Sequence, residues 1–246
     1  PSETAWILAF RGKGTDMYDV PIIRKADSFS NYGTINADHA NFYENYCAWY
    51  DMIARANLAI YAAELPEVSW ASATEKAYTL AQARFFRAFA YRNLAELFGG
   101  VPIVTEISTV ARYDFERATR VATYQYAINE LEAIENDLPE KTTKGGRLVR
   151  GAAQHNLCEL YLAMGTQLAT EGNASAAQAA FTKSVSFGDK VIDGGTYSLI
   201  NSRFGTRKSE LTFPMKIYKN GVYSESNVVD TIQVKANYYW DLFQEG

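Results

Sequence analysis

Aromatic residues beside polar side chains are the most prominent chemical feature of this sequence. Aromatic residues make up 14% of the 246 residues, with 17 Tyr and 4 Trp. A sugar presents flat C–H faces edged by hydroxyls, so its binding site needs an exposed ring beside Asp, Asn, Arg or Gln. Four segments have this composition. Their candidate ligand-binding residues are Asp16, Tyr18, Asp19, Asn31, Tyr32, Trp70, Tyr238, Tyr239 and Trp240. The alternative for each ring is packing beneath a loop.

Motifs for catalysis or metal binding are weak by comparison. The chain has two histidines: His155 lies in a helical pattern that favours a structural role, and His39 follows Asp38, which we expect to cap a helix. The sequence contains no G-x-S-x-G, no H-E-x-x-H and no paired-cysteine metal spacing. Carboxylates are plentiful, so a glycosidase pair stays open as an alternative. We expect a protein that is not an enzyme, with no catalytic residue, cofactor or metal.

Charge and hydropathy exclude further classes. A formal net charge of −4 and a pI near 5.4 argue against nucleic acid as a partner. No apolar run of about 18 residues is present, so the sequence predicts no membrane-spanning helix. Cys47 and Cys158 fall in helical patterns and are expected to be buried free thiols, with a disulfide between them left open.

The longest uninterrupted helical pattern runs from Thr74 to about Phe98. Thr74 is the predicted N-cap, and Gly99, Gly100 and Pro102 end the helix. Its apolar residues form two stripes, so we expect neighbours on more than one side. The expected wetter edges carry Thr79, Gln82, Arg92, Asn93 and Glu96. Arg84 and Arg87 are expected either to snorkel or to pair with carboxylates of a neighbouring helix, with a ligand role as the alternative.

Further helices are predicted over residues 40–65, 119–138, 150–164 and 173–193. Asn57 lies within the first of these, and we expect it to bond to the backbone of a neighbouring loop. Alternation from Leu211 and over residues 230–235, with an Asn220-Gly221 turn, predicts a β-hairpin region near the C-terminus. Helices joined by short turns favour an array of pairs like the tetratricopeptide (TPR) repeat.

Four of these helical patterns, taken in order, resemble the SusD/RagB family, whose members are nutrient-binding surface lipoproteins of Bacteroidetes that mostly bind glycans. The patterns are residues 53–58 (IARANL), 81–91 with 97–103 (AQARFFRAFAY and LFGGVPI), 126–139 (YAINELEAIENDLP) and 151–165 (GAAQHNLCELYLAMG). Gln82 stands where the family usually has an acidic residue. Gly14-Thr15-Asp16 matches a motif whose following loop lies on the family's ligand face, with Tyr18 as the nearest aromatic residue.

The resemblance implies a mostly α fold of TPR-like helical pairs with long aromatic-rich loops. The chain would be one incomplete domain over residues 1–246, because family members run to about twice this length. Residues 40–200 would form the scaffold, and residues 1–39 and 201–246 the ligand face. The implied function is capture of an oligosaccharide or peptide at the cell surface and its delivery to a SusC-like TonB-dependent transporter. A lipid anchor would hold the protein on the outer membrane.

Two other hypotheses make different predictions. A TPR-like helical module that binds a protein or peptide partner would carry its conspicuous aromatic residues on helix faces. A carbohydrate-active enzyme would carry a cleft with two facing carboxyl groups.

Overall fold

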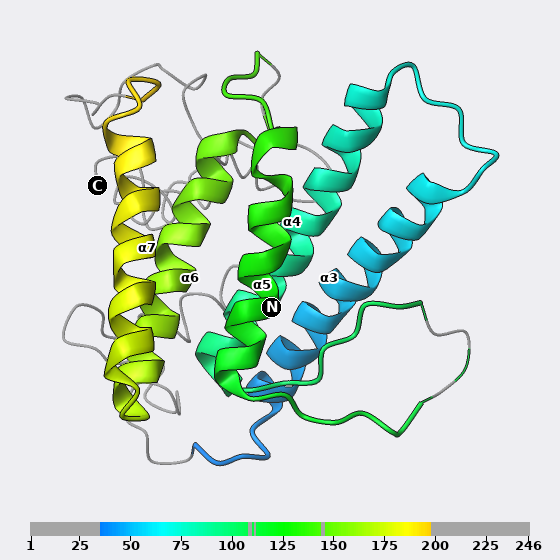
Figure 1. Ribbon diagram of the computed structural model, residues 1–246. Coiled ribbons are helices and arrows are strands. Elements are labelled where there is room, and N and C mark those ends of the chain that lie inside the picture. The colour runs from blue at the N-terminus through cyan, green and yellow to red at the C-terminus, as the bar shows by residue number, and fades with distance from the viewer. Residues whose placement is uncertain (1–34, 108–109, 111, 144–145, 198–246) are drawn as a thin grey trace, which may run out of the picture.

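The structure of the chain is a computed structural model that describes residues 35–107, 110, 112–143 and 146–197. Its elements, in order, are α3 (Ala40–Glu64), α4 (Ala73–Phe98), α5 (Arg120–Ile134), the short 3₁₀ helix η2 (Glu135–Asp137), α6 (Arg150–Thr170) and α7 (Ala174–Ile192) (Figure 1). These residue ranges contain no strand. The mostly helical class is therefore confirmed, while the predicted β-hairpin region lies outside the described residues.

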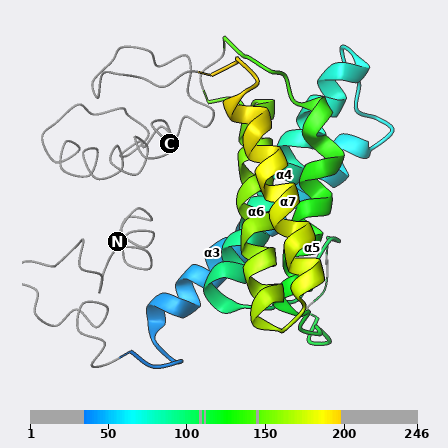
Figure 2. The same cartoon turned by 60° about the vertical axis from the view of Figure 1, so that its left-hand side comes forward.

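Consecutive helices pack side by side and run in opposite directions. Figure 2 shows this most clearly for α6 and α7, which lie next to each other along their whole length. Helix α4 packs between α3 and α5 and also contacts α6 and η2. Each large apolar side chain buried in such a core stabilises the fold by roughly 1.5–3 kcal/mol. The largest fully buried side chains include Tyr91, Phe85, Ile53, Leu94, Ile128 and Leu157.

Helix α4 begins and ends through local chemistry. Its N-cap is Ser72 and not Thr74, because the Ser72 hydroxyl accepts a hydrogen bond from the Glu75 backbone N–H at 3.0 Å. The Glu75 carboxylate accepts one in turn from the N–H of Ala71 at 3.1 Å, an arrangement close to a capping box. The predicted stop is confirmed: Gly99 has φ +80°, and a Cβ on Gly100 would lie 1.9 Å from a backbone oxygen of residue 118.

Two of the α4 residues that were expected on its more solvent-exposed edges are not exposed. Arg92 and Asn93 are buried. Arg92 forms ion pairs with Glu96 one turn later and with Glu159 of α6, and the Asn93 amide donates to the backbone carbonyl of Phe89 at 2.7 Å. The expectation fails because α6 covers part of α4, in addition to α3 and α5.

The last helical pair also departs from the sequence-based expectation. Helix α6 continues past Met164 to Thr170. Gly165 does not end the helix but lies against the ring of Phe181 in α7, where a Cβ would come within 2.6 Å of the ring. Val185 and Ile192, which the apolar pattern of residues 173–193 would place inside, are 62% and 70% exposed. Among the described helices, α6 is the one that packs along α7, so the opposite face of α7 has no helix over it.

Around α3 and α6, the structure corrects the expected cap of α3 and the expected burial of a cysteine. His39 and not Asp38 caps α3, since its Nδ1 accepts from the Asn41 N–H at 3.3 Å. Cys47 is exposed and Cys158 is half-buried, and both are free thiols. The expected free state is therefore confirmed, whereas the expected burial is wrong for Cys47. His155 lies beside Glu159, with 3.3 Å between Nε2 and the carboxylate.

In the described part of the chain, the helices are too short or too polar to cross a membrane.

Candidate ligand-binding site

The extended segment at residues 101–105, which follows α4, is held tightly against α3 and α4. The side-chain amide of Asn57 donates to the Val104 carbonyl at 3.0 Å, as the sequence predicted for a helical Asn near a loop. The hydroxyl of Tyr91 lies 3.1 Å from the same carbonyl, and that of Tyr50 donates to the Pro102 carbonyl at 2.6 Å. Burial raises the pKa of Tyr91 to about 12, so this hydroxyl keeps its proton at neutral pH.

A buried ionic cluster lies beneath this segment and joins three helices. Glu130 of α5 accepts from Arg84 at 2.9 Å and from Arg87 at 2.8 Å, so the predicted pairing of these arginines with a neighbouring helix is confirmed. Arg87 also donates to the Asn57 side chain of α3 at 2.8 Å. The side chains of Arg87 and Glu130 are each only 9% exposed. Asn57, which bonds to the segment, is thus itself fixed by the buried Arg87.

Two arginines bond to the C-terminal end of α4: Arg117, near the end of the 99–119 connection, and Arg120, the first residue of α5. Arg117 donates to the carbonyl of Phe98 at 2.9 Å and to that of Gly100, and Arg120 donates to the carbonyl of Ala95 at 2.9 Å. The Ala95 carbonyl also accepts from the backbone N–H of Gly99 at 3.1 Å, and a cation at this end favours the helix dipole. The two arms of the connection are therefore fastened to one helix end.

An open pocket of about 370 Å³ lies at this end of the bundle. Tyr46 and Phe98 meet edge to face in its wall, with ring centroids 5.2 Å apart. Ring faces beside a guanidinium are groups that a neutral, hydroxyl-bearing ligand can use. The lining residues are Tyr46, Phe98, Gly100, Val101, Pro102 and Arg117.

A second pocket of about 370 Å³ is lined by residues of α3, α4, α5 and η2. Its lining includes Leu80, Arg84 and Glu130 but no aromatic residue. Its two arginines are already engaged with Glu130 in the ionic cluster, and its other charged residues are Glu64 and Asp137. It is therefore less suited to stacking against a sugar than the pocket at the end of α4.

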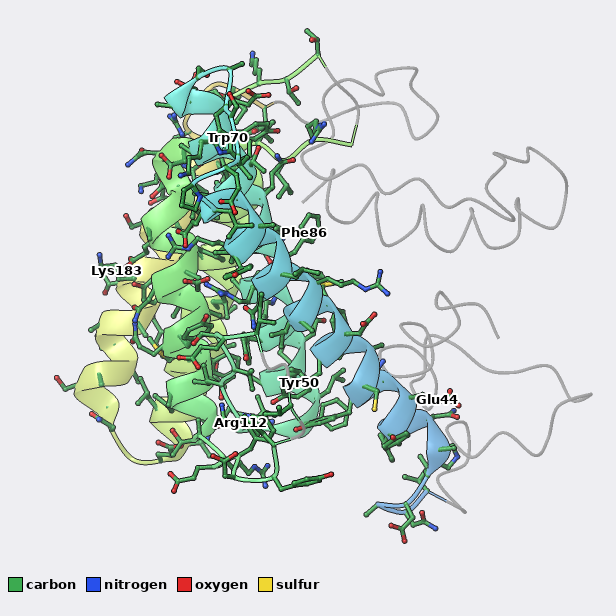
Figure 3. The ribbon with its side chains drawn as sticks, turned by 90° about the vertical axis from the view of Figure 1, so that its right-hand side faces the viewer. Glu44, Tyr50, Trp70, Phe86, Arg112 and Lys183 are labelled. Atoms are coloured by element: carbon green, nitrogen blue, oxygen red, sulfur yellow. The ribbon has the colours of Figure 1, made fainter. Side chains whose placement is uncertain are left out.

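Residues 112–115, Arg-Tyr-Asp-Phe, form a part of this end that the sequence analysis missed. Tyr113 is 94% exposed, and Arg112 donates to Asp114 through two nitrogens at 3.0 Å each. Figure 3 shows Arg112 and Tyr50 at the same end of the molecule. The signal was available, because an aromatic residue between Arg and Asp matches the composition used to select the four candidate segments.

The predicted site residues fall mostly outside the described part of the chain. Asp16, Tyr18, Asp19, Asn31, Tyr32, Tyr238, Tyr239 and Trp240 all lie there, so they remain predictions. Trp70 is half-buried, and its indole N–H donates to the Ala63 carbonyl near the end of α3 at 3.3 Å. Figure 3 places Trp70 at the end of the molecule opposite Arg112. The structure therefore does not bring Trp70 to the pocket at the end of α4.

Over the ranges the structure describes, no group of three or more His, Cys, Asp or Glu side chains is placed to hold a metal ion. The pocket at the end of α4 offers rings and an arginine and no carboxylate in its lining. It has the composition of a binding surface rather than of a pair of facing carboxyl groups.

Residues 13–162 match the model of the SusD-like family described as starch-binding and associating with the outer membrane. The match covers more than half of the chain, and this chain therefore belongs to that SusD-like family. It spans α3, α4, α5 and the first part of α6, which carry the buried ionic cluster and the pocket at the end of α4. No curated protein matches the chain.

Solved structures share the fold. A crystal structure with a xylogluco-oligosaccharide is 22% identical with a TM-score of 0.64, and the alignment covers 81% of this chain and 38% of that one. A SusD superfamily protein from Parabacteroides distasonis is 20% identical with a TM-score of 0.62, covering 81% and 40%. A laminarin-binding SusD-like protein is 24% identical with a TM-score of 0.54, covering 72% and 36%. This chain thus spans less than half the length of each.

Proposed function

We propose that this chain is part of a surface protein that binds a glycan and delivers it to a SusC-like TonB-dependent transporter. The observation that carries the proposal is membership of a SusD-like family described as starch-binding, over the residues that build the scaffold. Structural relatives that hold a xylogluco-oligosaccharide or bind laminarin support an oligosaccharide as the ligand class. The family's association with the outer membrane supports a place there, through a lipid anchor.

Binding of this kind needs shape and weak contacts but no reacting group. A ring stacks against the C–H face of a sugar, while amides, carboxylates and guanidinium groups bond to its hydroxyls. The helices would hold these groups in place, so that little flexibility is lost when the ligand binds. We propose Asp16, Tyr18, Asp19, Asn31, Tyr32, Tyr238, Tyr239 and Trp240 as contacts, together with the pocket at the end of α4.

Affinity electrophoresis in gels that contain starch, laminarin or xyloglucan tests the proposal, with product analysis of the same mixtures. We expect retarded migration in at least one gel and no cleavage products. Tyr18→Ala and Trp240→Ala are expected to abolish the retardation, whereas Trp70→Phe is expected to leave it unchanged. Release of shorter sugars would overturn the proposal, and so would free migration of the unaltered protein in every gel.

One observation favours the second hypothesis, a helical module that binds a protein partner. Tyr43, Leu58 and Tyr61 lie on α3 and are 72%, 55% and 56% exposed, although the apolar pattern of residues 40–65 would place Leu58 inside. Exposed aromatic residues on a helix are what this hypothesis predicts. Tyr43→Ser with Tyr61→Ser separates the two functions: under the glycan proposal, the double variant is retarded in the gels as strongly as the unaltered protein.

A further inference from the structure

Tyr113 is the most exposed large hydrophobic side chain among the described residues, at 94%. Large aromatic rings contribute most when they are buried, so a ring held out almost completely in water needs a reason. Phe115, two residues later, is 45% exposed. The 112–115 loop therefore presents aromatic surface at the same end of the molecule as the pocket beside Tyr46 and Phe98.

The residues on both sides of Tyr113 hold each other in place. Arg112 Nε lies 3.0 Å from one oxygen of Asp114, and its Nη2 lies 3.0 Å from the other. The guanidinium carbon also lies 5.1 Å from the centre of the Phe115 ring. The hydrogen bond from Arg112 lowers the pKa of Asp114, so the carboxylate stays charged at neutral pH. The loop tip is thus pre-organised around Tyr113.

The stem of the loop is fixed as well. The Ala118 N–H donates to the Val101 carbonyl at 3.2 Å, and Arg117 donates to the end of α4. Those contacts connect the loop to a segment that Asn57, Tyr91 and Tyr50 tie to the helices. A ring presented on a fixed support loses little entropy when a ligand stacks on it.

The charges around the ring decide which kind of ligand suits it. Arg112 and Asp114 neutralise each other, so Arg112 is not available to pair with a phosphate or a sulfate. A protein surface docked over Tyr113 would remove this ion pair from water. The desolvation penalty of such a pair often exceeds the attraction between its two charges. A sugar stacks on the ring and brings hydroxyls that can replace water at both charged groups. The combination favours a neutral glycan.

We propose that Tyr113 is a glycan-stacking platform, with Arg112 and Asp114 bonding to the hydroxyls of the sugar that covers the ring. This proposal rests on the proposed glycan-binding function and adds a contact outside the predicted aromatic segments. A glycan that covers Tyr113 and also occupies the pocket beside Phe98 would gain affinity from both contacts. The effect should therefore be larger for a polysaccharide than for a short oligosaccharide.

The test compares Tyr113→Ala with Tyr113→Phe, which keeps the ring, and with Tyr43→Ala, which removes another exposed tyrosine from α3. The probes are laminarin and xyloglucan, in affinity gels and by calorimetry. Tyr113→Ala is expected to weaken binding roughly twofold to tenfold, the range of one aromatic contact. Tyr113→Phe and Tyr43→Ala should bind like the unaltered protein. Circular dichroism melting curves should coincide for all four proteins, because Tyr113 is exposed.

Two outcomes would overturn the proposal, and they are distinguishable from each other. If the unaltered protein binds a polysaccharide and Tyr113→Ala binds it equally well, the platform is wrong while the glycan-binding function stands. If the unaltered protein binds neither these polysaccharides nor starch, the proposed function fails and the platform with it.

Discussion

Two arginine–carboxylate pairs in this protein have similar hydrogen bonds and opposite surroundings. Arg87 and Glu130 are each 9% exposed, in a cluster that joins α3, α4 and α5. Arg112 and Asp114 are 41% and 69% exposed, on either side of Tyr113. Removing one partner of a buried pair leaves an uncompensated charge, whereas an exposed pair exchanges its partner for water. The first pair therefore serves the scaffold, and the second can orient groups toward a ligand without serving stability.

The largest expected effect comes from breaking the buried pair. Glu130→Ala leaves Arg84 and Arg87 without their carboxylate, and we expect a loss of about 3–5 kcal/mol in the free energy of unfolding. Urea unfolding monitored by circular dichroism measures it. Asp51→Ala, which breaks the exposed Arg55–Asp51 pair on α3, is the matched control and should unfold at the same urea concentration as the unaltered protein. Equal stability of Glu130→Ala would contradict the assigned role.

A smaller loss is expected where the cluster meets the segment after α4. Asn57→Ala removes one donor to the Val104 carbonyl, which keeps the Tyr91 hydroxyl, and leaves the buried Arg87 without its acceptor on α3. We expect the free energy of unfolding, measured by urea denaturation, to fall by about 1–3 kcal/mol. Hydrogen exchange should also show faster exchange of the amides of residues 103–105. If these amides exchange as slowly as before, the segment is held by its other contacts and Asn57 is not its main support.

A third pair, between Arg92 and Glu159, has intermediate exposure and adds a pH dependence. His155 lies beside it, and burial lowers the pKa of His155 below 6.5, although Glu159 opposes the shift. The folded state then takes up the proton less readily than the unfolded state. Stability is therefore present above about pH 6.5 and lost as the pH falls toward the folded-state pKa.

His155→Gln should flatten this decline when urea midpoints are compared between about pH 7.5 and about pH 5.5. His39→Gln, which replaces the other histidine of the chain, is the control and should keep the slope. If the urea midpoint of His155→Gln changes with pH as steeply as that of the unaltered protein, the pH dependence comes from other groups.

The smallest expected effect on stability comes from the exposed pair. Asp114→Asn replaces one carboxylate oxygen with an amide, and we expect no resolvable change in the urea midpoint because water surrounds both partners. Under the proposed platform, the same variant should weaken binding of laminarin or xyloglucan, since the amide no longer fixes Arg112. Destabilisation by Asp114→Asn would show that the loop supports the fold and would remove the contrast between the two pairs.

Local rules predicted the helices of this protein well and their surroundings less well. The existence of five helices followed from apolar periodicity and from Gly and Pro at their ends, and Asn57 and Arg87 were assigned their kinds of partner correctly. The burial of Arg92 was missed, because no residue near it in the chain announces that α6 will cover that face. The Tyr113 loop was missed although its composition fits the rule applied to the four selected segments.

By itself, the amino-acid sequence determined the helical class, most helix ends and the resemblance to a SusD-like family, because these depend on residue spacing within single segments. Only the tertiary structure decided which polar residues are buried and which rings remain in water. That decision depends on the packing of helices distant in sequence: Glu130 fixes Arg87 from another helix, while Tyr113 stays exposed on a loop whose stem is tied to the end of α4.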